Sequence, residues 1–339
     1  MPRVSVLMPV YNTAPFLRQA IDSLLGQTFG DFELILIDDA STDGSWEIMR
    51  ACAARDARIV LMRNQSNLRQ AASLNRGLDA ARGQYILRQD SDDLSRPQRL
   101  AAMVYFMDEH PRTAILGSYI GMIDEEDRPV GHVFYPLGDP GIQALAVLRT
   151  PFTGPSVMMR ATVLRENGLQ FDPAMDYGED YDICSRLLRA GEGANLPDTL
   201  LQLRIRRGSD TDLHSRRQEQ TADKIALRNL AASGLRAFFS GEDILLLRSW
   251  AGKINALSVE ERHRQMALLK RYLAVLGPEL GVSVTDVALI RKKLVPQYVG
   301  GLAKMASKKD MLRLWASLAG IDPWGLLSVV SRLVINKFF

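Results

Sequence analysis

The chain has 339 residues, 47% of them hydrophobic, and a formal net charge of +3. This length can bury a full core and predicts one large domain with a smaller annex. The two cysteines, Cys52 and Cys184, have no Cys or His at metal-ligand spacing, which argues against disulfides and structural zinc and favours a reduced, cytoplasmic protein. No apolar run is long enough to span a bilayer, and the strand-like start at 4–10 leaves no room for a signal peptide.

Apolar runs alternate with amphipathic stretches up to about residue 205. In chain order they predict a strand over 4–9, a helix over 15–25, a strand over 32–37, a helix over 45–55, a strand over 58–62, a helix over 70–81, a strand over 85–89, a helix over 97–110, a strand over 114–116, a hairpin over 123–133, a strand over 155–159 and a helix over 179–189. This alternation over short links is typical of a doubly wound, mostly parallel α/β sheet flanked by helices.

The last part of the chain has a helical pattern, broken at Gly241, Pro278, Pro296 and Pro323. Residues 215–339 carry 20 Lys and Arg against 10 Asp and Glu, a net +10, whereas residues 1–214 carry 22 against 29, a net −7. We therefore predict a catalytic domain over 1–214 and an α-helical C-terminal region over 215–339. The basic charge favours contact with an anionic surface, and a solvated helical face explains it equally well.

Two acidic clusters follow predicted strands directly: Asp38 and Asp39 after 32–37, and the DSDD sequence 90–93 after 85–89. Ligands of a parallel sheet bind beyond the carboxyl ends of its strands, and converging carboxylates need a cation to offset their charge. The pattern thus predicts a site for a divalent metal with oxygen ligands, Mn²⁺ or Mg²⁺. Glycine-rich dinucleotide and P-loop sequences and a G-x-S-x-G elbow are absent, which argues against dehydrogenases, P-loop NTPases and serine hydrolases.

Four segments resemble, in order and spacing, family 2 glycosyltransferases of the GT-A fold. They are VSVLMPVYN at 4–12, LIDDASTDGS at 36–45, YILRQDSDDLSRPQRL at 85–100 and GEDYDICSRLLRAG at 178–191. The resemblance covers residues 3 to 210. It implies an inverting transfer of a sugar from a nucleoside-diphosphate sugar, with UDP as the expected carrier, to a hydroxyl of a glycan or lipid-linked glycan in bacterial-type surface glycan synthesis.

The resemblance also implies roles for single residues at the donor site. Asp39 would accept a hydrogen bond from the nucleobase, Asp90 would contact the ribose or sugar, and the wall of the nucleotide pocket would consist of Pro9, Val10, Tyr11 and Asn12. The metal would bind Asp92, with Asp93 supporting it or sharing the ligation. For three further residues we favour structural interpretations: a turn residue for Asp38, a solvated side chain for Arg69 and a helix-surface amide for Asn75.

The catalytic base is expected in the segment Glu179-Asp180-Tyr181-Asp182. On a helix Asp180 and Asp182 point to nearly opposite sides, so one of them faces away from the cleft. The family's Glu-Asp pair implies that Asp180 is the base and that Glu179 is its catalytic neighbour. Acidic residues in a first helical turn also suit the helix dipole, which gives Glu179 and Asp182 a structural alternative.

Two departures from the family pattern concern the acceptor and the diphosphate. Many relatives carry a His where this chain has Thr153 and Gly154. We assign an acceptor contact to these two residues, and this contact differs from that of the relatives. The sequence Leu203-Arg204-Ile205-Arg206-Arg207 replaces Tyr-Arg-x-His, and we assign Arg204 and Arg206 to the donor phosphates. An exposed basic loop is the alternative for these arginines.

The stretches 311–318 and 326–339 are amphipathic and lie among basic residues. They fit peripheral contact with the inner face of a membrane, and a packed helical annex or a homodimer surface is the alternative that we favour. No nucleic-acid partner is expected. Two other functions stay open: an inactive nucleotide-sugar-binding or scaffold protein, which would not need Asp180 and Asp92, and a nucleotidyltransferase, which usually has a Gly-rich basic segment where this chain has 11–15.

Overall fold

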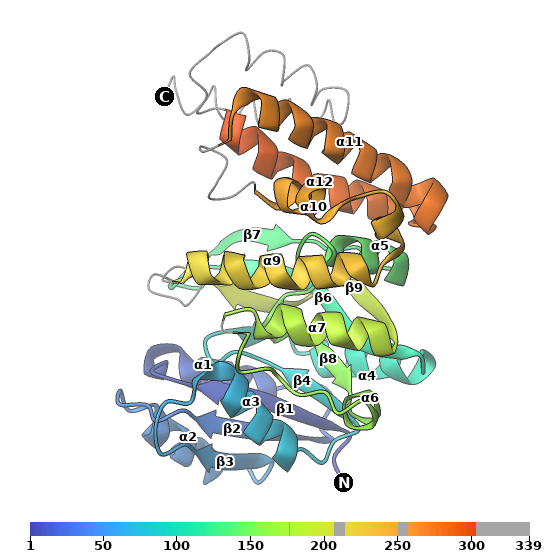
Figure 1. The fold of residues 1–339 in the computed structure, drawn as a ribbon. Helices are drawn as coiled ribbons and strands as arrows, with labels where there is room; N and C mark the ends of the chain where they lie inside the picture. Colours follow the sequence, from blue (N-terminus) through green and yellow to red (C-terminus); the bar gives the residue numbers. More distant parts are fainter. Residues whose placement is uncertain (176, 207–213, 250–256, 303–339) are drawn as a thin grey trace. The chain divides into compact units, whose positions relative to one another are not determined.

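The computed structural model describes residues 1–175, 177–206, 214–249 and 257–302 (Figure 1). Two compact units emerge from its contacts. The first consists of residues 1–137 and 152–222, and the second of residues 138–151 and 223–339. The division into a catalytic domain over 1–214 and a helical region over 215–339 remains a prediction about function. The contacts group residues 138–151 with the C-terminal unit.

A single mixed sheet forms the centre of the first unit, in the order β3-β2-β1-β4-β8-β6-β9-β5, with β7 paired to β6. Its first four strands in space, β3 (Ile59–Arg63), β2 (Phe32–Asp38), β1 (Val4–Val10) and β4 (Tyr85–Arg88), are parallel. Every residue of β2 is buried, as expected of a strand covered on both faces.

The second half of the sheet mixes directions. Strand β8 (Met158–Arg160) is antiparallel to β4 and to β6 (Thr113–Ile123), whereas β9 (Glu192–Arg204) runs parallel to β6. The hairpin of β6 with β7 (Pro129–Val133) and the short β5 (Leu94–Ser95), which pairs with β9, complete it.

Helices flank the sheet and connect its strands (Figure 1). They are α1 (Ala14–Leu25), α2 (Ser45–Ala53), α3 (Arg69–Ala80), α4 (Arg99–Glu109), α6 (Ala161–Glu166) and α7 (Glu179–Ala190). The face of α1 that carries Leu17, Ile21 and Leu24 is buried in the same core as Val6 and Leu34 of the strands. The predicted doubly wound, mostly parallel α/β fold is confirmed.

The structure corrects several predicted boundaries. The strand expected over 155–159 begins only at Met158, because Gly154–Ser156 forms a turn of 3-10 helix. Strand β6 continues to Ile123 instead of ending at 116. The sequence pattern did not predict the 13-residue strand β9. Its side chains do not alternate cleanly between buried and exposed, so no period of two marks it in the sequence.

The second unit is helical. It contains α5 (Asp139–Ala146), the 3-10 turn Gly234–Ala237, α10 (Gly241–Arg248), α11 (Val259–Leu280) and α12 (Val284–Leu302), and α9 (Ser215–Ala231) begins in the first unit and ends in the second. Buried hydrogen bonds attach α5 to this unit: Tyr272 Oη donates to Ala144 O at 2.5 Å, and Asn229 Nδ2 donates to Ala146 O at 2.7 Å.

Two of the predicted breaks in this helical part are wrong, because Pro278 lies inside α11 and Pro296 inside α12. Gly241 does start a helix, after a capping box in which Ser240 and Asp243 bond each other's backbone N–H groups. Pro323 and the amphipathic stretches 311–318 and 326–339 lie outside the described residues. Among the described helices, none has the length and hydrophobicity that a bilayer crossing requires.

Candidate active site

The carboxyl ends of β1, β2 and β4 meet at one edge of the sheet because these strands are parallel neighbours. Asp38 ends β2 and Asp39 follows it, while Asp90, Asp92 and Asp93 follow β4. The structure therefore places both acidic clusters at the edge where parallel sheets bind ligands.

Asp39 is a buried acceptor at this edge of the sheet. Its side chain is 4% exposed, and Oδ1 accepts hydrogen bonds from Asn64 Nδ2 at 2.6 Å and from the backbone N–H of Leu68 at 2.8 Å. Leu68 leaves 44% of its surface exposed, and Tyr11, which follows β1, leaves 48% exposed. A fixed carboxylate together with exposed apolar side chains is a suitable arrangement for holding a planar base.

The four residues predicted as the pocket wall differ in their exposure and contacts. Pro9 is half-buried and Tyr11 is exposed, but Val10 is 0% exposed and packs in the core, so the predicted wall contact of its side chain is wrong. Strand alternation points Val10 away from the cleft, and only its backbone O reaches the site, where it accepts from Asp39 N at 2.8 Å. Asn12 joins two loops, since its Oδ1 accepts from the backbone N–H of Thr42 at 2.8 Å.

Asp38 has a structural position. It is fully buried, its Oδ1 accepts from the backbone N–H of Ser41 at 3.2 Å, and its Oδ2 lies 3.0 Å from Nε of Arg63. Arg63 in turn stacks on the ring of Trp46 at 4.8 Å. These contacts support the interpretation of Asp38 as a turn residue.

The loops around this edge hold backbone conformations that residues with a Cβ rarely adopt. Asn12, Ala40, Arg69 and Tyr177 have φ angles of 51°, 61°, 69° and 60°. Such angles cost energy and concentrate at ligand sites. Arg69 is exposed, as expected of a solvated side chain, and its guanidinium lies over the ring of Tyr177 at 5.9 Å. Tyr177 also stacks on His214 at 4.2 Å.

His214 was not predicted, because no motif or period surrounds it in the sequence. Asn75, predicted as a helix-surface amide, is half-buried in the structure. Its side chain bonds both backbone groups of Phe171, accepting from N at 2.8 Å and donating to O at 2.7 Å. It thereby fixes the segment that leads to α7.

The DSDD carboxylates are paired with arginines. Asp90 Oδ1 accepts from Arg88 Nη2 at 3.1 Å and from Gln70 Nε2 at 3.1 Å, and Asp92 Oδ2 accepts from Arg206 Nε at 2.6 Å. Burial raises the pKa of Asp90, and so do the charges of Asp92 and Asp180, while Arg88 opposes the shift. Arg88 therefore offsets the effect of burial on Asp90 only in part.

Asp93 is the most deeply placed of these carboxylates, at 1% exposure. Its Oδ1 accepts from the backbone N–H of Arg204 at 2.9 Å, and its Oδ2 has no hydrogen bond from any described residue. Burial raises the pKa of Asp93 well above its usual value, with Asp92 and Asp90 adding to the shift.

Arg204 corrects one predicted donor contact. Its side chain is 0% exposed, with Nε donating to Asp92 O at 2.9 Å and Nη2 to Gln19 Oε1 at 3.1 Å, and with Nη1 2.7 Å from Asp127 Oδ1. The guanidinium also lies over the ring of Phe16 at 4.7 Å. Its donors are used within the fold, so Arg204 is structural. Arg206 keeps the phosphate assignment, and Arg207 lies outside the described residues.

The three acidic residues in the first turn of α7 differ in burial and in their partners. Asp182 is buried and paired with Arg186 at 2.6 Å, whereas Asp180 is half-buried and its Oδ1 accepts from the backbone N–H of Tyr181 at 2.7 Å. Glu179 is buried, and burial together with the charge of Asp180 raises its pKa to about 7. Of the three carboxylates, only Asp180 is both partly accessible and free of an ion pair with a described residue.

Thr153 and Gly154 lie beside Asp180. Thr153 Oγ1 is 2.9 Å from Tyr135 Oη. A Cβ placed on Gly154 would lie 2.3 Å from Arg88 Nη1 and 2.7 Å from Asp180 Oδ2. The predicted acceptor segment, the predicted base and Arg88, which bonds Asp90, therefore lie close together in the structure.

Comparison with known proteins assigns this site to a family. The model of glycosyl transferase family 2 matches residues 5–168. The putative glycosyltransferase EpsE of Bacillus subtilis is 39% identical over 219 residues, which are 64% of this chain and 76% of that protein. The chain belongs to glycosyl transferase family 2. An uncharacterized glycosyltransferase of Haemophilus influenzae is 30% identical over 237 residues, covering 68% of this glycosyltransferase and 73% of that protein.

Solved structures agree on the fold of this glycosyltransferase. TarS 1-349 of S. aureus in complex with UDP-GlcNAc has a TM-score of 0.59 at 20% identity, and the match covers 95% of this chain and 92% of that one. The mannosyltransferase PcManGT of Pyrobaculum calidifontis, in complex with GDP-Man and Mn²⁺, has a TM-score of 0.57 at 17% identity and covers 95% and 87%. The predicted GT-A fold is confirmed.

The carboxylates of this glycosyltransferase fit a metal only in part. Within the described ranges, no three His, Cys, Asp or Glu side chains gather as a metal site would require. A divalent ion would therefore take one or two ligands from Asp92 and Asp93 and the others from substrate phosphates and water, as Mg²⁺ commonly does. The buried Asp93 Oδ2 without a hydrogen bond from the described residues is consistent with such a ligand.

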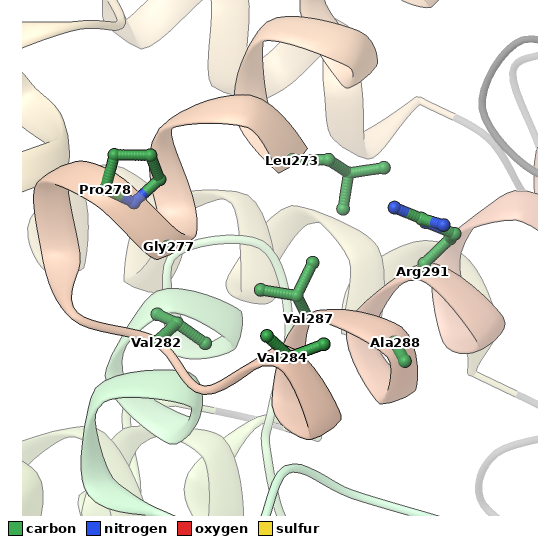
Figure 2. A pocket seen from close by; sticks show the side chains of 8 residues that line it. All are labelled: Leu273, Gly277, Pro278, Val282, Val284, Val287, Ala288 and Arg291. Carbon is green, nitrogen blue, oxygen red and sulfur yellow. The ribbon is translucent and has the colours of Figure 1, made fainter.

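Two cavities of the described residues are lined by none of the predicted site residues. One, of about 230 Å³, lies between α11 and α12 and is lined by aliphatic side chains such as Leu273 and Val287, with Arg291 at its border (Figure 2). The other, of about 260 Å³, adjoins the end of α3 and α6 and is lined by residues that include Asp79 and Arg165.

Proposed function

We propose that this glycosyltransferase is an inverting enzyme that moves a sugar from a nucleoside-diphosphate sugar, with UDP as the carrier, to the hydroxyl of a glycan or lipid-linked glycan. The observation that carries the proposal is the position of Asp180. Its Oδ2 and Nη1 of Arg88, the partner of Asp90, both lie close to Gly154, while its acidic neighbours Asp182 and Glu179 are ion-paired or buried. The structural relatives support the donor class, because TarS was solved in complex with UDP-GlcNAc and PcManGT in complex with GDP-Man.

The proposed roles follow from the partners of each residue. Asp39 and the exposed Tyr11 would bind the base, Asp90 the ribose or sugar, and Arg206 the diphosphate. Asp180 would take the proton from the acceptor hydroxyl as its oxygen attacks the anomeric carbon and the nucleoside diphosphate leaves. A divalent ion held by Asp92 and Asp93 would neutralise charge on the diphosphate. A role in surface glycan synthesis belongs to the same proposal.

The metal assignment predicts that donor binding depends on Asp92. With Mn²⁺ present, Asp92→Asn should weaken binding of UDP about 10- to 100-fold, because a neutral amide is a poor ligand for a hard cation. Calorimetry of UDP binding measures this, with and without EDTA. Asp22→Asn, on the exposed surface of α1, is the matched control and should bind UDP as the parent does. UDP binding that survives both EDTA and Asp92→Asn would refute the metal assignment.

We also propose peripheral membrane contact through the basic C-terminal region, from its net charge of +10 over 215–339. The full chain should co-sediment with vesicles containing phosphatidylglycerol at low salt and not with neutral vesicles, because the attraction is electrostatic and is screened by salt. Equal recovery from both kinds of vesicle, or none from either, would remove the membrane proposal and leave a packed helical annex or a dimer surface.

A further inference from the structure

We propose that Arg88 is a positioning residue for the base Asp180: its guanidinium joins the donor carboxylate Asp90 to the base and holds the base carboxylate toward the donor. The inference rests on the proposed function, because it requires Asp180 to be the base. It adds a residue that neither the family resemblance nor the acidic motifs assigned a role.

Arg88 is a buried cation whose donors are only partly used. It is the last residue of β4 and is 3% exposed. Nη2 donates to Asp90 Oδ1 at 3.1 Å, while Nε and Nη1 have no hydrogen-bond acceptor among the described residues. A buried N–H group without an acceptor is costly, so these donors favour any acceptor that reaches them.

Asp180 is a second carboxylate close to Arg88. Both Arg88 Nη1 and Asp180 Oδ2 lie close to the position that a Cβ on Gly154 would occupy, at 2.3 Å and 2.7 Å. Because these two distances add to 5.0 Å, the nitrogen and the oxygen are at most 5.0 Å apart. No hydrogen bond joins the two side chains in the described structure, although they lie within this distance of each other.

Gly154 is what allows this approach. Any side chain there would lie between the guanidinium and the carboxylate at distances that atoms do not tolerate, and it would push them apart. The segment is held firmly, because Ser156 N donates to Thr153 O at 2.9 Å and Arg99 Nη2 donates to Pro155 O at 2.7 Å. A shift of the backbone is therefore not an easy way to make room.

Arg99 also holds the backbone of Arg88 in place. It is 0% exposed, and its Nη2 donates to the backbone O of Arg88 at 3.1 Å as well as to Pro155 O. The same side chain thus holds the strand end that carries Arg88 and the loop that carries Gly154. The charge of Arg88 is placed by the fold between Asp90 and Asp180 before any substrate binds.

The test combines Arg88→Gln with Asp180→Asn. Arg88→Gln keeps most of the side-chain length but removes the charge, and it should lower sugar transfer or donor hydrolysis about 10- to 100-fold in the parent chain, the scale of a lost positioning contact. In the Asp180→Asn chain the same change should have almost no effect, because residues that act through one another are not additive. Arg88→Lys should recover part of the rate by restoring the charge.

The readouts separate this inference from the proposed function. Nucleoside-diphosphate binding, measured by calorimetry, and the melting temperature report the donor site and the fold, and Arg112→Gln on an 83% exposed arginine is the matched control. An equal loss of rate from Arg88→Gln in both backgrounds, or no loss in the parent, would overturn the inference. If Arg88→Gln does not fold, Gly154→Ala replaces it in the same pair of chains with the same outcomes. Full activity of Asp180→Asn by itself would instead reject the proposed base.

Discussion

Asp180→Asn is expected to reduce transfer about 10²- to 10⁴-fold, the usual effect of losing a general base, and to leave UDP binding unchanged. The amide keeps the shape of the side chain and can still accept from the backbone N–H of Tyr181, so the start of α7 should stay intact. What it loses is affinity for the acceptor proton. Release of nucleoside diphosphate from a UDP-sugar, with water as the acceptor, provides the assay.

Asp182→Asn is the matched control, two residues along the same helix. Asp182 is buried and ion-paired with Arg186, so its loss should lower stability more than activity. Thermal melting of both variants separates these effects. If Asp182→Asn were folded and inactive while Asp180→Asn hydrolysed donor at the parent rate, the base would be Asp182 and the alignment with the family motif would be wrong.

Arg99→Leu should destabilise the protein by about 3 to 5 kcal/mol, the usual result of removing one partner from a buried charge network. Arg99 Nη1 donates to Gln89 Oε1 at 2.9 Å and to Ser95 Oγ at 3.0 Å, and Nη2 bonds two backbone carbonyls. Burial lowers the pKa of Arg99 to about 9, and Asp93 and Asp90 oppose that shift. Leucine would leave these acceptors and the charge of Asp93 without their partner.

Urea unfolding monitored by circular dichroism measures this loss. Arg112→Leu replaces a surface arginine that pairs with the partly exposed Glu192 and should change the unfolding free energy by less than about 1 kcal/mol. An Arg99→Leu protein as stable as the parent would show that the network around Gln89 and Ser95 contributes nothing to the fold.

Features that depend on neighbours in the sequence were predictable. The apolar runs gave the parallel strands, and Asp39 and the DSDD residues lie at strand ends because a strand end is a local property. The helix period also indicated that Asp180 and Asp182 point to nearly opposite sides, and the family resemblance was required to choose Asp180 as the expected base.

Features that depend on distant partners were not predictable from the sequence. Arg204 looked like a phosphate ligand because its partners Gln19 and Asp127 are far away in the chain. Val10 lies in the core because of the pleat of β1, which a one-residue change in register would reverse. Arg88 and Gly154 meet only through the antiparallel pairing of β4 with β8, which no local pattern indicates.

The position of Arg204 at the end of β9 also has a consequence for synthesis of the chain. Its side chain joins the backbone of Asp92 to Gln19, a residue 185 positions earlier, and its own N–H holds Asp93. On the ribosome, a nascent chain that has not yet produced this strand lacks the Arg204 groups that hold the DSDD loop. Contacts between such distant positions form late in folding. The loop that would carry the metal is therefore completed only when nearly the whole of the first unit has been translated.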